Sequence, residues 1–444
     1  MNRILIFFFF LIVNCSLDSK SGLWTNTQKI EEEKVVIKES TTKELFSEEQ
    51  ATEKELNPNI KIRILSKPRN NALKNNFNNN IGFVNYDGDL KKISKFKYKT
   101  IKNFNFYELD IVFDNENIIF FDNKGSILKF NDNSKLIWKK NFYNKRQRKA
   151  QPILFFANNK EKLIVADNIA KYYALDINTG ELLWSKRNTS SFNSQIKIYK
   201  DRFFLIDLEN VLRCYSLKDG KEIWNLKTEK SFIKSQKKLS LIVYDNKVYF
   251  SNSVGDISAV DIDSGSLMWQ TPTQGNLIYE DAFFLKTSDL IANPNSILFS
   301  NNKNQFFSLD IKSGTINWQQ KINSNLRSTL IDDLIFSVSM EGFLIVTDLS
   351  TGNIIRTTDI FEGFIKNYLL KKGPQRTKQK PVGFIVGKKN IYLTTDRGRL
   401  LIIDILTGKT QSVIKIDKKE KISRPFALNQ NLFIIKNDAI IKLN

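Results

Sequence analysis

The chain has 444 residues, of which 41% are hydrophobic and 12% aromatic, a composition that supports a folded core and excludes a disordered protein. It contains no histidine and only two cysteines, Cys15 and Cys214. These counts remove the commonest general acid–base residue and exclude a thiolate zinc cage. A net charge of +21 is compatible with nucleic-acid binding, but no nucleic-acid-binding motif accompanies it. We therefore predict no nucleic-acid partner.

The first 14 residues have the pattern of a targeting signal. Residues 4–13 form an unbroken apolar run, ILIFFFFLIV, which is shorter than the roughly 20 residues that span a bilayer. The run ends at Asn14 and Cys15, and polar residues follow. This pattern resembles the lipobox of bacterial lipoproteins, in which the cysteine is acylated and becomes the new N-terminus, although Asn14 stands where a small residue is usual. The resemblance implies a lipoprotein signal peptide over residues 1–14 and lipidation at Cys15. The alternative is an ordinary signal peptide with a chance cysteine.

Residues 15–80 show no apolar periodicity. Residues 31–55 are rich in glutamate and residues 70–80 in asparagine. Such a composition buries too little apolar surface to offset the entropy of ordering the chain, so we predict a flexible tether here. With Cys15 acylated, the tether is lipid-anchored and membrane lipid is an expected partner. Since Ser16, rather than Asp, follows the cysteine, the lipoprotein resemblance implies the outer membrane.

From about residue 103 onward, one turn motif recurs along the chain. An Asp-x-x-[Thr/Ser]-Gly turn is followed, four residues after the glycine, by a tryptophan, as in the stretch from Asp261 through Gly265 to Trp269. The tryptophans recur with the period of a propeller blade. Two later copies are degenerate and carry Arg356 and Ser412 in place of the tryptophan. The predicted structural repeat residues are Trp138, Trp184, Trp224, Trp269, Trp318, Gly180, Gly220, Gly265, Gly314, Gly352 and Gly408.

The motif predicts an all-β fold over residues 81–444. Aspartate and glycine favour a tight turn between antiparallel strands, and the tryptophan supplies a large apolar side chain to pack between neighbouring sheets. Seven copies are complete and an eighth begins near Asn431, where the chain soon ends. We therefore predict an eight-bladed β-propeller of four-stranded antiparallel blades. A strand within residues 91–102 is expected to close the ring, because an unpaired sheet edge would otherwise remain.

The repeat resembles the PQQ-type propeller repeat, and over residues 82–444 the chain is similar to the BamB family of outer-membrane assembly lipoproteins. The resemblance implies a non-catalytic scaffold, one copy per complex, at the periplasmic face of the outer membrane. Such a scaffold binds the periplasmic POTRA repeats of the β-barrel assembly subunit and aids insertion of outer membrane proteins. By position, it implies partner-binding residues in two long connections, 228–239 and 270–295. These residues are Ile233, Ser235, Gln236 and Asp289, of which Ser235 and Gln236 depart from the family's leucine and arginine.

Quinoprotein dehydrogenases share the repeat and are the main rival interpretation. They bind PQQ with calcium and typically carry a vicinal cysteine disulfide, which this chain cannot form. Its repeat aspartates have a structural role in the turns, so we predict no catalytic residue, no cofactor and no metal site. The sequence is also compatible with a different periplasmic propeller that binds proteins, and with long connections that have no partner. The basic loop 371–380 (KKGPQRTKQK) is interpreted as a solvated insertion.

Overall fold

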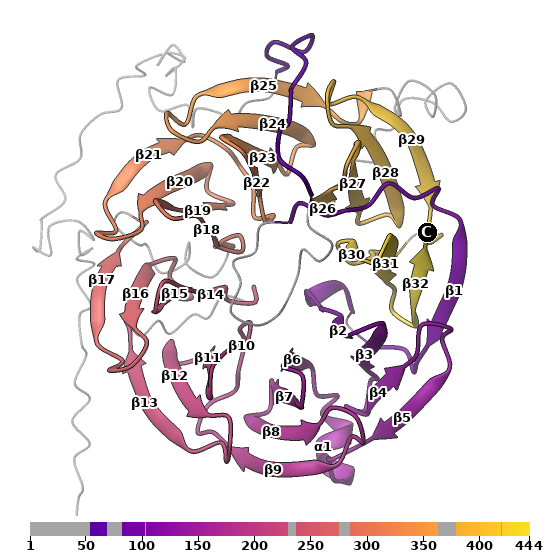
Figure 1. Ribbon diagram of the computed structural model, residues 1–444, viewed down its shortest axis with the longest axis vertical. Helices are drawn as coiled ribbons and strands as arrows, with labels where there is room; N and C mark the ends of the chain where they lie inside the picture. Colours follow the sequence, from indigo (N-terminus) through magenta and orange to yellow (C-terminus); the bar gives the residue numbers. More distant parts are fainter. Residues whose placement is uncertain are drawn as a thin grey trace, which may run out of the picture. The chain divides into compact units, whose positions relative to one another are not determined.

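The computed structural model describes residues 54–68, 82–102, 104–229, 237–274, 285–362, 379–418 and 420–444. In these residues the chain forms eight antiparallel sheets of four strands each, arranged around a central axis (Figure 1). The predicted eight-bladed propeller is confirmed. Among the helices of the described ranges, none is long and apolar enough to cross a membrane.

The blades follow one another in chain order, and each runs from an inner strand to an outer strand. The first blade holds β2 (Val112–Asp114), β3 (Asn117–Phe121), β4 (Ile127–Phe130) and β5 (Leu136–Lys140), and the second β6 (Leu154–Asn158), β7 (Lys162–Asp167), β8 (Lys171–Asp176) and β9 (Leu182–Arg187). The third holds β10 (Lys197–Tyr199), β11 (Arg202–Ile206), β12 (Val211–Ser216) and β13 (Glu222–Lys227), and the fourth β14 (Leu241–Tyr244), β15 (Lys247–Ser251), β16 (Ile257–Asp261) and β17 (Leu267–Thr271). The fifth holds β18 (Ile291–Ala292), β19 (Ser296–Asn301), β20 (Gln305–Asp310) and β21 (Ile316–Gln320), and the sixth β22 (Thr329–Ile331), β23 (Leu334–Val338), β24 (Phe343–Asp348) and β25 (Ile354–Asp359). The seventh holds β26 (Pro381–Val386), β27 (Asn390–Thr395), β28 (Arg399–Asp404) and β29 (Thr410–Lys415). The eighth holds β30 (Phe426–Leu428), β31 (Asn431–Ile435), β32 (Ala439–Leu443) and β1 (Lys92–Lys97). The short helices η1 (Phe104–Phe106) and α1 (Lys145–Lys149) lie outside the blades.

Burial along the strands explains why the middle strands are continuously apolar. In the second blade β7 (KLIVAD) is buried at every position after its first, because neighbouring blades cover both faces of the sheet. The outer strand β9 (LLWSKR) has only exposed and partly buried residues, which alternate from Leu183 onward, as expected at the rim. Apolar clusters between adjacent sheets therefore form the core.

The turn glycine of one blade packs against the tryptophan of the blade before it. Gly352 has φ +75°, and a Cβ atom there would lie 2.5 Å from Cδ2 of Trp318. Only glycine meets both conditions without strain. The indole nitrogen of Trp318 also donates a hydrogen bond to the carbonyl oxygen of Leu349, at 2.8 Å. The same packing joins Trp138 to Gly180, Trp184 to Gly220, Trp224 to Gly265 and Trp269 to Gly314.

The ring closes between the two ends of the propeller sequence. Strand β1 pairs antiparallel with β32, with Lys95 opposite Ile441 and Phe96 opposite Ile440. Phe96 is fully buried against Phe130 of the first blade and Phe433 of the eighth. The predicted closure by a strand within residues 91–102 is confirmed.

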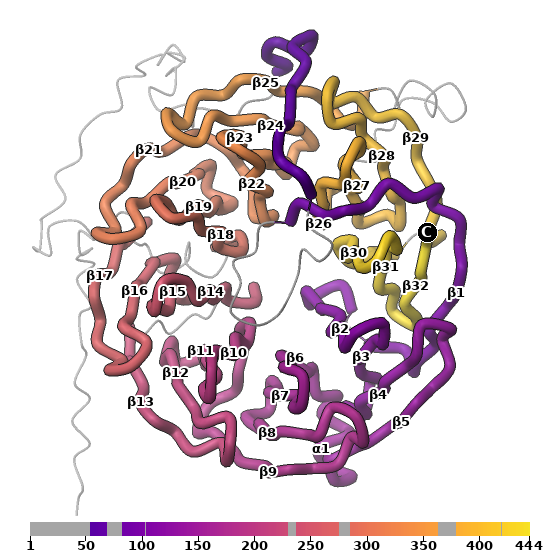
Figure 2. The backbone as a smooth tube through the Cα atoms, viewed as in Figure 1, coloured from indigo at the N-terminus to yellow at the C-terminus, as the bar shows by residue number. Residues whose placement is uncertain are grey.

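Residues 54–68, which fall within the expected tether 15–80, are docked on the sixth and seventh blades. Leu56 forms a β-bridge with Thr357, and the amide of Ile62 donates to the carbonyl oxygen of Leu406 at 3.0 Å. This stretch therefore differs from a free connector, because backbone hydrogen bonds hold it to the ring. The dark tube in Figure 2 follows it from the rim toward the centre.

Candidate interaction face and axial cavity

The order of the strands determines which loops and turns lie on each of the two faces of the ring. Each inner strand starts where the connection from the preceding blade arrives, and strand direction then alternates from the axis to the rim. All inter-blade connections therefore lie on one face, together with the turns between second and third strands. We call this the loop face. The Asp-x-x-[Thr/Ser]-Gly turns lie on the opposite face, which we call the turn face. Residues 60–66 contact turns of the sixth and seventh blades, so they lie on the turn face.

The two connections predicted to bind a partner both belong to the loop face. Residues 228–239 join β13 to β14. Within residues 270–295, residues 272–290 join β17 to β18, and β18 itself follows. Ile233, Ser235 and Gln236 lie outside the described residues. The same holds for Cys15 and for residues 371–378 of the basic loop.

Asp289 is described, and it lies in a different environment from the one expected. It is only 5% exposed, and its Oδ2 accepts a hydrogen bond of 3.1 Å from Nη1 of Arg424. Asp289 precedes the inner strand β18 by two positions, where the chain has already turned toward the axis. The structure therefore places this side chain in an internal ion network instead of an exposed loop.

Sequence reasoning missed this ion network, which gathers around the axis from several blades. Its members share a position: Asp110, Asp289, Arg327 and Arg424 each stand two residues before an inner strand, and Lys238 stands three before. Since all inner strands start at the same level of the ring, equal offsets bring side chains from distant blades together. The offset is visible only once the inner strands are located.

Arg424 is the centre of the network. Its Nη2 donates to Oδ1 of Asp110 at 2.6 Å, while its Nη1 binds Asp289. Lys238 also contacts Asp110 through its ammonium group. Burial alone would raise the pKa of Asp110, but Lys238 and Arg424 outweigh it and hold the pKa of this carboxyl well below its usual range. The same balance, with Arg424 foremost, lowers the pKa of Asp289.

The guanidinium of Arg327 makes fewer contacts than that of Arg424. It is 7% exposed, and its Nη1 lies 3.9 Å from Oδ2 of Asp289, beyond hydrogen-bond distance. Neither Nη1 nor Nη2 has a hydrogen-bond partner, and Oδ1 of Asp289 also has none. Burial, with the nearby charge of Arg424, lowers the pKa of Arg327 to about 9. Its charge is therefore incompletely compensated.

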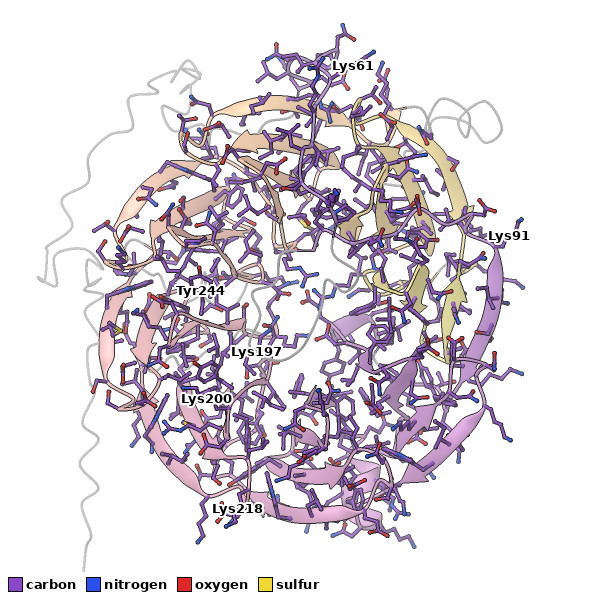
Figure 3. The ribbon with its side chains drawn as sticks, viewed as in Figure 1. Lys61, Lys91, Lys197, Lys200, Lys218 and Tyr244 are labelled. Atoms are coloured by element: carbon purple, nitrogen blue, oxygen red, sulfur yellow. The ribbon has the colours of Figure 1, made fainter. Side chains whose placement is uncertain are left out.

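Two adjoining cavities open this network toward the loop face. The inner cavity has a volume of about 40 Å³ and is lined by Arg327, Asp289 and Arg424 among others. The outer cavity has about 250 Å³ and shares Tyr107, Lys237 and Lys421 with the inner one. Cations outnumber carboxylates in both described linings. Figure 3 shows Lys197 at the inner edge of the ring, in contrast to Lys218 at the rim.

The axial residues do not fit a calcium-dependent quinone cofactor. Calcium takes six to eight oxygen ligands. Asp110 and Asp289 instead face arginine and lysine, and Glu108 accepts from Lys237 at 2.6 Å. Across the described ranges no three His, Cys, Asp or Glu side chains are grouped so as to hold a metal ion. The arrangement suits binding of an anion better than binding of a cation.

Comparisons with known proteins agree with the fold. Residues 123–358 match the family described as outer membrane protein assembly factor BamB. The crystal structure of BamB from Moraxella catarrhalis superposes with a TM-score of 0.61 at 15% identity, covering 80% of this chain and 99% of that one. The computationally designed protein Ika8 gives 0.60 at 12% identity, with 80% and 99% covered. Quinohemoprotein alcohol dehydrogenase from Comamonas testosteroni gives 0.60 at 10% identity, with 80% and 76% covered. No curated protein sequence matches the chain significantly.

Proposed function

The protein belongs to the BamB family of outer membrane protein assembly factors, and from this membership we propose that it is a non-catalytic scaffold of the outer-membrane β-barrel assembly machinery. It binds the periplasmic repeats of the assembly subunit and aids insertion of outer membrane proteins. One copy acts within the complex, tethered to the outer membrane by an acylated Cys15. The observation that carries this proposal is the family match over residues 123–358.

The partner surface that we propose is the loop face. The connections 228–239 and 270–295 join neighbouring pairs of blades on that face, so the predicted contact residues Ile233, Ser235 and Gln236 belong to its third inter-blade connection. Loops on a rigid scaffold are common sites of binding. Asp289 lies beneath this surface, where its carboxylate accepts a hydrogen bond from Arg424 and helps to hold the connection in place.

The docked N-terminal segment favours the same assignment. Residues 60–66 contact Leu406 and Asp332 on the turn face, so these residues leave the loop face uncovered. Further toward the N-terminus, Leu56 pairs with Thr357 on the outer strand β25, and Glu55 accepts from the amide of Asp359. A tether that leaves the ring at this rim position holds the propeller to a membrane while the loop face stays accessible to a protein. The proposal therefore places anchoring at the rim of the ring and binding on the loop face.

Site-specific photo-crosslinking in whole cells tests the proposal. We expect a photoreactive residue at position 233 or 235 to form an adduct with the assembly subunit, identified by mass spectrometry. Position 218, an exposed lysine on the turn face, is the matched control and is expected to give no such adduct. Position 289 serves as a buried control. Adducts with the assembly subunit from position 218 but none from 233 or 235 would show that the partner binds the turn face, against the proposal. If no position gave an adduct, the assembly subunit would be rejected as the partner.

The dehydrogenase interpretation rests on likeness of fold to quinohemoprotein alcohol dehydrogenase, which at 10% identity carries no information about activity. Titration of the purified chain with PQQ and Ca²⁺, followed by absorbance, separates the two functions. The scaffold proposal expects no stoichiometric calcium-dependent complex. If PQQ instead gave a saturable, calcium-dependent absorbance change together with dye-linked alcohol oxidation, the scaffold proposal would be rejected in favour of a dehydrogenase.

A further inference from the structure

We propose that the first inter-blade connection of the loop face is a contact surface for anionic phospholipid headgroups. This connection, residues 141–153, carries the helix α1 (Figure 1), and the turn 122–126 of the first blade lies beside it. The inference goes beyond the proposed scaffold role, and it depends neither on the partner protein nor on acylation of Cys15. Five exposed cations form the surface, which we call the basic patch: Lys124, Lys145, Arg146, Arg148 and Lys149.

The basic patch is built on an ordered base. Helix α1 begins with a capping box, in which the side chains of Asn144 and Gln147 accept from each other's backbone amides at 3.0 Å. Asn141 joins the connection to the turn. Its side-chain amide donates to the carbonyl oxygen of Lys124 at 3.0 Å, and its Oδ1 accepts from Nε of Arg148 at 3.1 Å. The cations of the two segments are therefore held near one another on one surface.

Negative charge does not offset these cations at the surface. The two segments of the basic patch contain one carboxylate, Asp122, which is buried and accepts a hydrogen bond from Lys139 at 3.0 Å. Asp167 lies beneath the connection, where it is also buried and accepts from the hydroxyl of Tyr143 at 2.6 Å. Both carboxylates are turned inward and already have donors. The exposed charge of the basic patch is therefore positive, and it attracts an anionic partner.

The chemistry of the basic patch favours a lipid surface over an acidic protein. Protein interfaces have an apolar centre and are poor in lysine. The exposed large apolar side chains of the described residues all lie outside the two segments of the basic patch. Clusters of about four to eight lysines and arginines on an exposed helix are instead typical of binding to anionic lipids. Because a bilayer presents many phosphates side by side, long flexible side chains reach them without a preformed pocket.

The position of the basic patch is compatible with the proposed partner surface. The patch lies between the first and second blades, whereas the connections 228–239 and 270–295 follow the third and fourth blades. Lipid contact at the patch therefore leaves both partner connections uncovered. The N-terminal segment leaves the ring at the sixth blade, on the other side of the ring from α1 (Figure 1). Attachment at two such separated places would limit rotation of the ring about its tether.

Limited proteolysis of the full chain mixed with lipid vesicles tests the proposal, because each cation of the basic patch is also a site for trypsin. With vesicles of phosphatidylethanolamine and phosphatidylglycerol (about 3:1), we expect cleavage after Arg148 to slow at least about fivefold. The reference is cleavage after Lys312, an exposed lysine on the turn face. Vesicles of phosphatidylcholine alone, or inorganic phosphate at the same phosphorus concentration, should give no protection. Sodium chloride at about 0.5 M is expected to abolish the protection, because salt screens exposed charges.

A triple variant locates the contact. Lys145→Gln, Arg146→Gln and Lys149→Gln together leave Arg148 as the tryptic site. We expect this variant to reduce the protection of Arg148 by anionic vesicles to less than about twofold, because each cation near a lipid surface contributes separately. All three side chains are exposed, so the ring is expected to fold as in the parent chain.

The matched control removes the same charge from the turn face, through Lys218→Gln, Lys221→Gln and Lys409→Gln, and should leave the protection intact. Equal cleavage after Arg148 with anionic and neutral vesicles would overturn the proposal. Protection that the first triple variant keeps, or that inorganic phosphate reproduces, would overturn it as well. Protection by the periplasmic repeats of the assembly subunit, without any effect of vesicles, would assign the basic patch to an acidic protein surface instead of a lipid.

Discussion

Arg356 on β25 donates a hydrogen bond from Nη2 to the carbonyl oxygen of Ile405, at 3.3 Å. Trp318 makes the equivalent contact one blade earlier, from its indole nitrogen to Leu349. Both acceptors directly follow the aspartate of the Asp-x-x-Thr-Gly turn. The arginine therefore replaces the tryptophan at a degenerate repeat. Its Nη1 also donates to the carbonyl oxygen of Ile60, at 3.0 Å, which no tryptophan could reach in addition.

This double contact predicts that Arg356 holds the N-terminal segment to the ring. Replacing it by methionine removes the donor for the buried carbonyl oxygen of Ile405 and the part-buried one of Ile60, so we expect Arg356→Met to lower the free energy of unfolding by about 2 kcal/mol. We also expect faster tryptic cleavage after Lys61, because the backbone there loses its anchor. Urea denaturation and timed proteolysis with peptide mapping measure the two effects.

Two further variants separate docking from blade packing. Arg356→Trp restores the hydrogen bond to Ile405 but not the one to Ile60, so it is expected to recover stability while Lys61 stays susceptible. Arg187→Met is the control for loss of an exposed arginine. Cleavage after Lys61 at the parental rate in Arg356→Met would show that the segment is held by its other contacts.

A second prediction concerns Phe96, on the strand β1 that closes the ring. Its side chain is fully buried between Phe130 and Phe433, which belong to the first and last blades. We expect Phe96→Ala to cost about 3–5 kcal/mol in urea denaturation, the range for truncating a buried phenylalanine.

Ile93 on the same strand provides the matched control, since it is 50% exposed. We expect Ile93→Ala to change the unfolding free energy by no more than about 0.5 kcal/mol. Similar costs for the two variants would mean that β1 contributes little through its core face.

Much of the propeller was predictable because its repeats are enforced by local chemistry. A turn that needs φ > 0 and a tryptophan that packs on the same glycine leave a periodic signature, as at Trp318 and Gly352. Ring closure followed from an incomplete last blade. Helix α1 was not predicted, although Asn144 and Gln147 form a capping box whose residue types are visible in the sequence.

The axial network and the docked segment were not predictable in the same way. Asp110 and Arg424 are far apart in the chain and meet only because both precede inner strands by two residues. The strand starts are separated by irregular connections, so no fixed period marks these positions. Docking of residues 54–68 uses backbone carbonyls such as that of Leu406 and the side chain of Asp332, which accepts from the amides of Leu65 and Ser66. The partners contributed by the segment are mostly main-chain groups, which leave no trace in residue identity.

Lys197 predicts a dependence of stability on pH. It is 2% exposed on β10, and burial, opposed by Asp289 and reinforced by Arg327, lowers its pKa from 10.5 to about 7. At a pH between about 7 and 10.5, Lys197 is protonated in the unfolded chain and deprotonated in the folded protein. Unfolding then takes up a proton, so the contribution of Lys197 to stability rises as pH increases from about 7 to about 10 and is lost as pH falls.

The variant Lys197→Met isolates this effect, because methionine fills a similar volume and cannot titrate. We expect the parent chain to gain stability relative to Lys197→Met as pH rises through this window, by a total on the order of a few kcal/mol. Lys200→Met, on an exposed turn three residues further along (Figure 3), is the control and should show a constant difference from the parent. Urea denaturation at several pH values measures both differences. A constant difference for Lys197→Met as well would mean that the ammonium stays protonated in the folded ring, its charge balanced by Asp289 and Asp110 despite burial.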